Sequence, residues 1–110
     1  MPNRQQSISS HIRKEVKGML KNTLERMKER NIRIHDNIIE ILFMVESKTT
    51  EKVEELIDDT WTLIEMQKFE LKQLEVLNVF LDESNMAELR MCVAVCAIYE
   101  LQLSKIKIGE

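Results

Sequence analysis

An arginine and a histidine stand five positions apart in the segment Arg30-Asn31-Ile32-Arg33-Ile34-His35. Their types and spacing suit chemistry on a phosphodiester. His35 could exchange a proton with a ribose hydroxyl as acid or base, and Arg30 could hold the charge of the phosphate. The alternative interpretation is that both side chains lie on a solvated turn or helix face.

The same six residues resemble the Arg-x4-His signature of HEPN-type ribonucleases, in which a polar residue such as Asn often follows the arginine. Those are small helical proteins, frequently dimeric, whose two motif copies meet to cleave RNA without a metal. The resemblance implies that Arg30 and His35 are catalytic. It covers these six residues only, and here the motif follows one helix, whereas in the family it usually lies late in the bundle. We keep a ribonuclease as an alternative to a non-enzymatic protein.

Few other residues offer catalytic or metal-binding chemistry. Cys92 and Cys96 lie in an apolar run, which is typical of small buried hydrophobes in a reducing compartment. A redox pair or half of a metal site is the alternative. His11 and Glu15 lie one helical turn apart and, without a second such pair, are interpreted as structural. We therefore predict no metal, no cofactor and no enzymatic activity.

Charge is unevenly distributed along the chain. Residues 1–35 carry a net charge of +6 and residues 36–110 a net charge of −9. Lys14, Lys17, Lys21 and Lys28 fall within about 60° of one another on a helix. This basic stripe indicates nucleic-acid binding as an alternative function. It is also typical of a solvated face, or of a helix that complements acidic neighbours in its own fold.

The only tryptophan stands among acidic residues. Trp61 has Asp58, Asp59 and Glu65 close to it in the sequence. An exposed tryptophan ringed by acids would anchor a basic partner, so these four residues are the predicted partner-binding set. The alternative is a tryptophan in the core or in a dimer seam.

Residues that force turns are scarce, since glycine occurs only at Gly18 and Gly109 and proline only at Pro2. We expect one all-α domain over residues 1–110, an elongated three-helix bundle with long antiparallel helices and coiled-coil-like packing. Its helices should span about 8–46, 50–82 and 85–104, and residues 1–7 should be disordered. Poor helix formers leave open a break between about residues 30 and 37, which would give four helices.

Apolar tracks show which faces of these helices should be covered. The first helix carries a heptad track that is apolar except at one position: Leu20, Leu24, Met27, Asn31, Ile34, Ile38, Ile41 and Val45. The second helix carries a main track and also a second one, of Met66, Phe69, Val76 and Phe80, which predicts contact with more than one neighbour. The third helix is apolar all round over residues 91–99, which predicts burial on every side.

The length of the second helix argues for a second copy. About 33 residues span roughly 50 Å, whereas a compact 110-residue domain has a radius of gyration near 13 Å. We therefore expect a homodimer. Its predicted seam consists of Asn31, Ile34, Ile38, Leu71, Leu74 and Asn78.

The expected function follows from these faces. The sequence predicts an adaptor or regulatory subunit that assembles with itself and with another, unidentified protein. With neither a signal peptide nor a membrane-spanning run, we expect it in the cytosol or nucleus.

Overall fold

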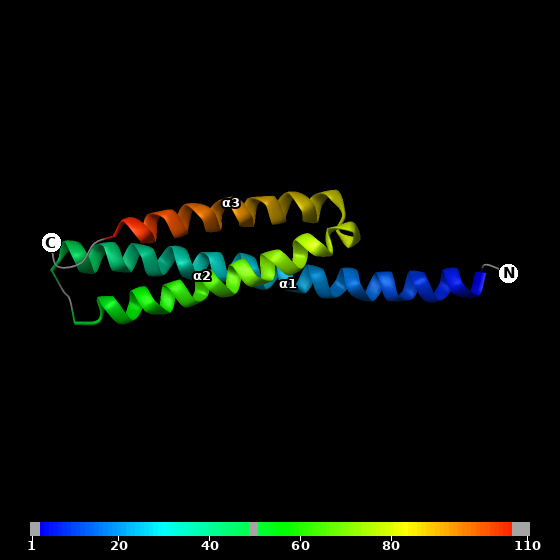
Figure 1. The fold of residues 1–110 in the computed structure, drawn as a ribbon, viewed down its shortest axis with the longest axis horizontal. Coiled ribbons are helices and arrows are strands. Elements are labelled where there is room, and N and C mark those ends of the chain that lie inside the picture. The colour runs from blue at the N-terminus through cyan, green and yellow to red at the C-terminus, as the bar shows by residue number, and fades with distance from the viewer. Residues whose placement is uncertain (1–2, 49–50, 107–110) are drawn as a thin grey trace.

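A computed structural model describes residues 3–48 and 51–106, with side chains described from Ser10 onward. These residues form three α-helices, α1 (Asn3–Glu46), α2 (Val53–Val76) and α3 (Glu83–Lys105), and a short 3-10 helix, η1 (Asn78–Phe80). Consecutive helices run antiparallel along one long axis (Figure 1). The molecule measures 71 × 20 × 16 Å and has a radius of gyration of 18.7 Å. The prediction of an elongated all-α three-helix bundle is confirmed.

Helix α1 is uninterrupted, so the alternative of a break near residues 30–37 does not occur, and the helix begins at Asn3, before the predicted start. Asn31 is buried at its seam. The Asn31 amide donates to the backbone oxygen of Cys92 in α3 and accepts a hydrogen bond from Gln67 in α2. Because both ends of this amide are satisfied inside the bundle, a polar residue at the seam does not interrupt the packing.

Helix α2 ends at Val76, earlier than predicted. The chain continues through Leu77 and η1 to Leu81, which is extended (φ −96°, ψ 140°). Phe80 and Leu81 pack partly against the core. Helix α2 thus ends without a glycine or a proline, and the residues that follow it pack against the core.

The starts of α3 and α2 differ in how they are capped. The sequence offers Ser84 and Asn85 as possible caps, but α3 is capped by Asp82, whose side chain accepts a hydrogen bond from the Asn85 N–H at 2.8 Å. Helix α2 begins after Lys52, which makes no side-chain capping bond. The sequence offers Thr49 or Thr50 as the cap of this helix, and both lie outside the described residues.

One core runs along the bundle and is built from all three helices of the same chain. This corrects the predicted dimer seam, because five of its six residues are buried within one copy: Asn31, Ile34, Ile38, Leu71 and Leu74. The sixth, Asn78, is exposed at the start of η1. These residues join the helices of a single chain, since α1 and α2 pack directly on each other.

Helix α3 is covered on one side only, which corrects the expectation of burial all round. Cys92 and Cys96 face the core, but Met91, Ile98 and Leu101 are each more than half exposed. The reason is geometric: in a three-helix bundle both neighbours lie toward the same face of a helix. No helix in the described part of the chain has the length and apolar character needed to cross a bilayer.

Candidate functional site

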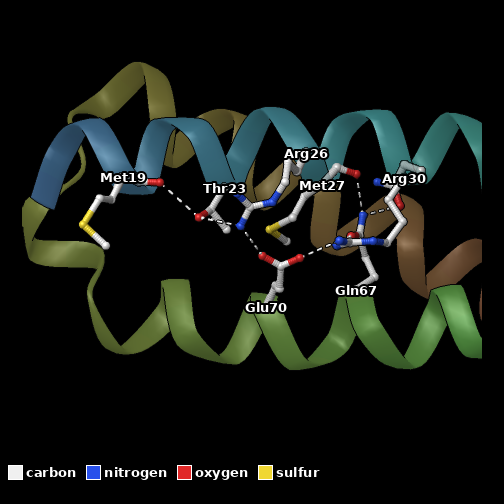
Figure 2. A network of polar contacts seen from close by, with 8 residues as sticks. Met19, Thr23, Arg26, Met27, Arg30, Gln67 and Glu70 are labelled. Atoms are coloured by element: carbon white, nitrogen blue, oxygen red, sulfur yellow. Dashed lines mark hydrogen bonds and ion pairs between the residues drawn. The ribbon is translucent and has the colours of Figure 1, made fainter.

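A cluster of polar side chains fixes how α1 lies against α2 (Figure 2). Gln67 of α2 is fully buried, and its Nε2 donates to the backbone oxygen of Met27 and to Asn31 Oδ1, each at 2.7 Å. The Arg30 guanidinium donates to Gln67 Oε1 at 2.9 Å and pairs with Glu70 at 2.6 Å. A one-turn shift of either helix would leave these groups without partners, so the cluster sets the register of α1 and α2.

Ion pairs between helices surround this cluster. Glu70 also forms an ion pair at 3.1 Å with Arg26, which lies one turn before Arg30 on α1 (Figure 2). The other pairs are Lys28–Glu88 at 3.4 Å between α1 and α3, and Lys68–Glu100 at 3.0 Å between α2 and α3. Part of the basic character of α1 is therefore neutralised by acids of the same fold.

An apolar groove opens between α1 and the C-terminal half of α2. This α1/α2 groove has a volume of about 550 Å³, and its lining includes Met19, Leu20, Phe69, Gln73, Val76 and Leu77. A second hollow of about 540 Å³ shares Phe69 and Gln73 with it and continues along α2 past Met66 and Glu65. The two hollows together follow the outer side of α2 over several turns.

The apolar side chains that border the groove lie open. Met19 is 68% exposed, Phe69 64% and Val76 80%. Single exposed apolar residues are ordinary on protein surfaces, whereas a contiguous set beside a hollow marks an interaction site. The groove is therefore a candidate binding site.

The N-terminal part of α1 extends past the connection between α2 and α3 (Figure 1). We call residues 3–19 the projecting segment. Ile12, Val16 and Met19 lie at four- and three-residue spacing on a face of this segment that is rotated away from the core-facing track beginning at Leu20, and we call these three residues the apolar ridge. Val16 packs partly on the core, while Ile12 is 53% exposed. The ridge thus reaches from the edge of the groove to a stretch of helix with no neighbour in the described chain.

The predicted basic stripe divides into two parts. Lys14, Lys17 and Lys21 are exposed and form no ion pair within residues 10–48 and 51–106. Lys28 bonds to Glu25 at 2.9 Å and also reaches Glu88, and the hydrogen bond with Glu25 is the main reason that its pKa is raised. At 100° per residue the three free lysines lie on the side of α1 opposite the ridge.

The structure does not bring Arg30 and His35 together within one copy. Two side chains that are five positions apart on one helix point in directions about 140° apart, so Arg30 and His35 face different neighbours. Arg30 is held by Gln67 and Glu70 on α2. The His35 ring lies 5.9 Å from the ring of Tyr99 on α3, and its Nδ1 lies 3.3 Å from Asp36 Oδ1.

Trp61 packs partly against the core instead of standing exposed. The predicted acidic neighbours Asp58, Asp59 and Glu65 are exposed, but they do not ring the tryptophan, because Asp59 lies about 160° from it around α2. Only Glu65 of this set borders the groove region. Apart from Glu65, the predicted partner-binding residues lie in the N-terminal half of α2 and do not line the groove.

The cysteines have the surroundings of core residues. Both Cys92 and Cys96 are free and buried. Burial raises the pKa of each thiol, whereas nucleophilic and metal-binding cysteines require the thiolate. His11 pairs with Glu15 at 3.1 Å on an exposed turn. No group of three or more metal-ligating side chains is found among the described residues.

No protein-family model matches this chain, and comparison with curated proteins and with solved structures likewise finds no match. The site therefore rests on geometry. Sequence reasoning identified Met66, Phe69 and Val76 as a second contact face of α2 but assigned partner binding to the tryptophan region. These residues lie on a different side of α2 from the buried track through Ile64 and Leu71. That difference in helical position is the sequence signal for the groove.

Proposed function

We propose that this chain is a non-enzymatic interaction subunit that receives an amphipathic helix of another polypeptide in the α1/α2 groove. The observation that carries the proposal is the gathering of exposed apolar side chains from two helices at one groove. A groove of this kind suits helix-in-groove recognition, in which the docking helix presents apolar residues at three- and four-residue spacing.

The polar cluster beside the groove supports this use. Gln67 and Arg30 tie α1 to α2 at the level of the second hollow, and Arg26 and Glu70 line that hollow as a polar rim. A groove whose walls are already fixed loses little conformational freedom when a ligand enters, which favours binding.

The exposed surface is large enough to matter energetically. A phenylalanine buries about 150–250 Å² when fully covered, so the 64% exposure of Phe69 leaves roughly 100–160 Å² for a partner. At about 25 cal/mol per Å² this corresponds to a transfer free energy of roughly 2.5–4 kcal/mol, from which the costs of association are subtracted. Phe69 therefore offers enough apolar area to serve as an anchor for a docked helix.

Site-specific cross-linking tests the proposal. A photoreactive phenylalanine analogue replaces Phe69 in the full chain, and in a control it replaces Phe43, which is 70% exposed in the last turn of α1. In extract of the native cell we expect the position-69 chain to form an adduct that maps to one amphipathic helix. Equal labelling from both positions, or no adduct at position 69, would contradict the proposal.

A second candidate function is nucleic-acid binding by the projecting segment. The observation in its favour is that Lys14, Lys17 and Lys21 are exposed on one face without acidic partners among the described side chains. Affinity for single- or double-stranded nucleic acid should then fall steeply with salt. Replacing the three lysines by Glu should abolish binding, whereas Lys105→Glu, on an exposed residue at the end of α3, should not. A flat salt response would exclude this function.

The ribonuclease alternative makes a separate prediction. If Arg30 and His35 cleave RNA, His35→Ala removes the cleavage and leaves the helicity unchanged. The separation of the two side chains on α1 gives this alternative no support from within a single copy.

A further inference from the structure

The apolar ridge and the α1/α2 groove meet at Met19, which belongs to both. Each copy of the chain therefore carries an uncovered helix surface and, directly beside it, an uncovered apolar hollow. A twofold axis near the stretch from Val16 to Met19 would place the ridge of each copy over the groove of the other. Such an arrangement is isologous: it closes as a dimer and covers both surfaces at once.

The charges near the groove allow this occupant. Lys72 is the one charged residue that lines the groove, so the helix face that docks there should carry no charge. The apolar ridge meets this requirement, although residues 10–21 of α1 carry four basic residues and one acidic residue. Because Lys14, Lys17 and Lys21 lie on the side opposite the ridge, docking through the ridge leaves their ammonium groups in water.

Part of the projecting segment lacks the packing that usually stabilises a helix. In proteins most helical stability comes from the packing of an amphipathic face, and Ile12 is more than half exposed within one copy. Gly18 also lowers the helix propensity of the segment, by about 1 kcal/mol relative to alanine. Contact with a second body would supply the missing stabilisation.

We propose that the groove is occupied by a second copy of the same chain, whose projecting segment runs antiparallel to the first copy's α1. Ile12 of each copy then lies between Phe69 and Val76 of the other. This inference rests on the proposed function, because it identifies the helix that the groove receives. It differs from the seam predicted from the sequence, since the buried face of α1 stays inside each copy.

Sedimentation velocity of the full chain over a range of concentrations tests the proposal. We expect a mass of twice 13.0 kDa at high concentration and dissociation on dilution. Ile12→Glu on the ridge and Phe69→Glu in the groove should each raise the dimer dissociation constant at least a hundredfold. The matched control Phe43→Glu, also an exposed phenylalanine, should leave the constant unchanged.

Mixing the two disabled variants tests the reciprocity of the contact. The Phe69→Glu variant has an intact ridge, and the Ile12→Glu variant has an intact groove. A dimer of one copy of each therefore keeps one undamaged ridge-to-groove contact. The mixture should therefore dimerise more strongly than either variant alone. If ridge packed on ridge instead, mixing would restore nothing, and that result would overturn the arrangement.

Hydrogen exchange supplies a readout that does not depend on mass. Amides of residues 10–19 should be protected in the wild-type dimer and should lose protection in Phe69→Glu, although residue 69 lies on another helix. A chain that stays monomeric at all concentrations would overturn the second copy as occupant. The cross-link from position 69 would still report whether a different protein docks, so the two proposals fail separately.

Discussion

The hydrogen bond between Asn31 and Gln67 makes the most demanding prediction about how the bundle is held together. The two amides meet at 2.7 Å in the buried contact of α1 with α2. Asn31→Leu and Gln67→Met are close in shape to the residues they replace. Each single change removes one hydrogen-bond partner from the other, still buried amide, whereas the double change removes both amides.

The magnitude follows from the asymmetry of buried hydrogen bonds. An unsatisfied buried polar group costs about 1–3 kcal/mol, while replacing both partners by apolar groups is nearly neutral. The double variant should therefore be more stable than the sum of the two single effects predicts, by about 2 kcal/mol. Coupling of this size lies well within the range found for residues in direct contact.

Urea denaturation followed by far-UV circular dichroism measures the four free energies of unfolding, at one fixed protein concentration because an oligomer's stability depends on it. A control cycle pairs Leu20→Ala with Ile41→Ala, two buried residues about 30 Å apart along α1. The control effects should add within about 0.5 kcal/mol. If the Asn31 and Gln67 effects also add within that limit, the amide pair does not determine how α1 meets α2.

Three further predictions concern other parts of the chain. Lys48 has φ 59°, so Lys48→Gly should raise the free energy of unfolding by up to about 1 kcal/mol in urea titrations, and a decrease would contradict the assigned backbone. Leu24→Ala should lower the free energy of unfolding by about 2–5 kcal/mol because Leu24 is fully buried, whereas Phe43→Ala, on an exposed residue, should change it by less than about 0.5 kcal/mol. Burial raises the pKa of the Cys92 and Cys96 thiols, so the unfolded chain releases these protons first as pH rises. Stability should therefore hold below about pH 8.5 and decline as pH increases through the folded-state thiol pKa; removal of both thiols by Cys→Ala should flatten the decline.

The candidate site was only partly accessible from sequence. The second track of α2 was recognised as a contact face, and Phe69 and Val76 belong to it. Trp61 could not be placed, because a half-buried tryptophan and an exposed anchor share the same periodicity. Arg30 and His35 likewise form a regular pair in sequence, and only the positions of α2 and α3 show that they face different neighbours.

The sequence by itself determined the helices and the face of α1 that must be buried. Heptad spacing from Leu20 to Ile41, with scarce glycine and proline, leaves a long amphipathic helix as the only regular structure that segregates its apolar side chains. It did not determine whether that face meets the same chain or another one, since both produce the same pattern. Tertiary structure made that choice by folding α2 and α3 back onto residues 20–46 of α1. Because α2 and α3 are shorter than α1, the same folding left the ridge and the groove uncovered.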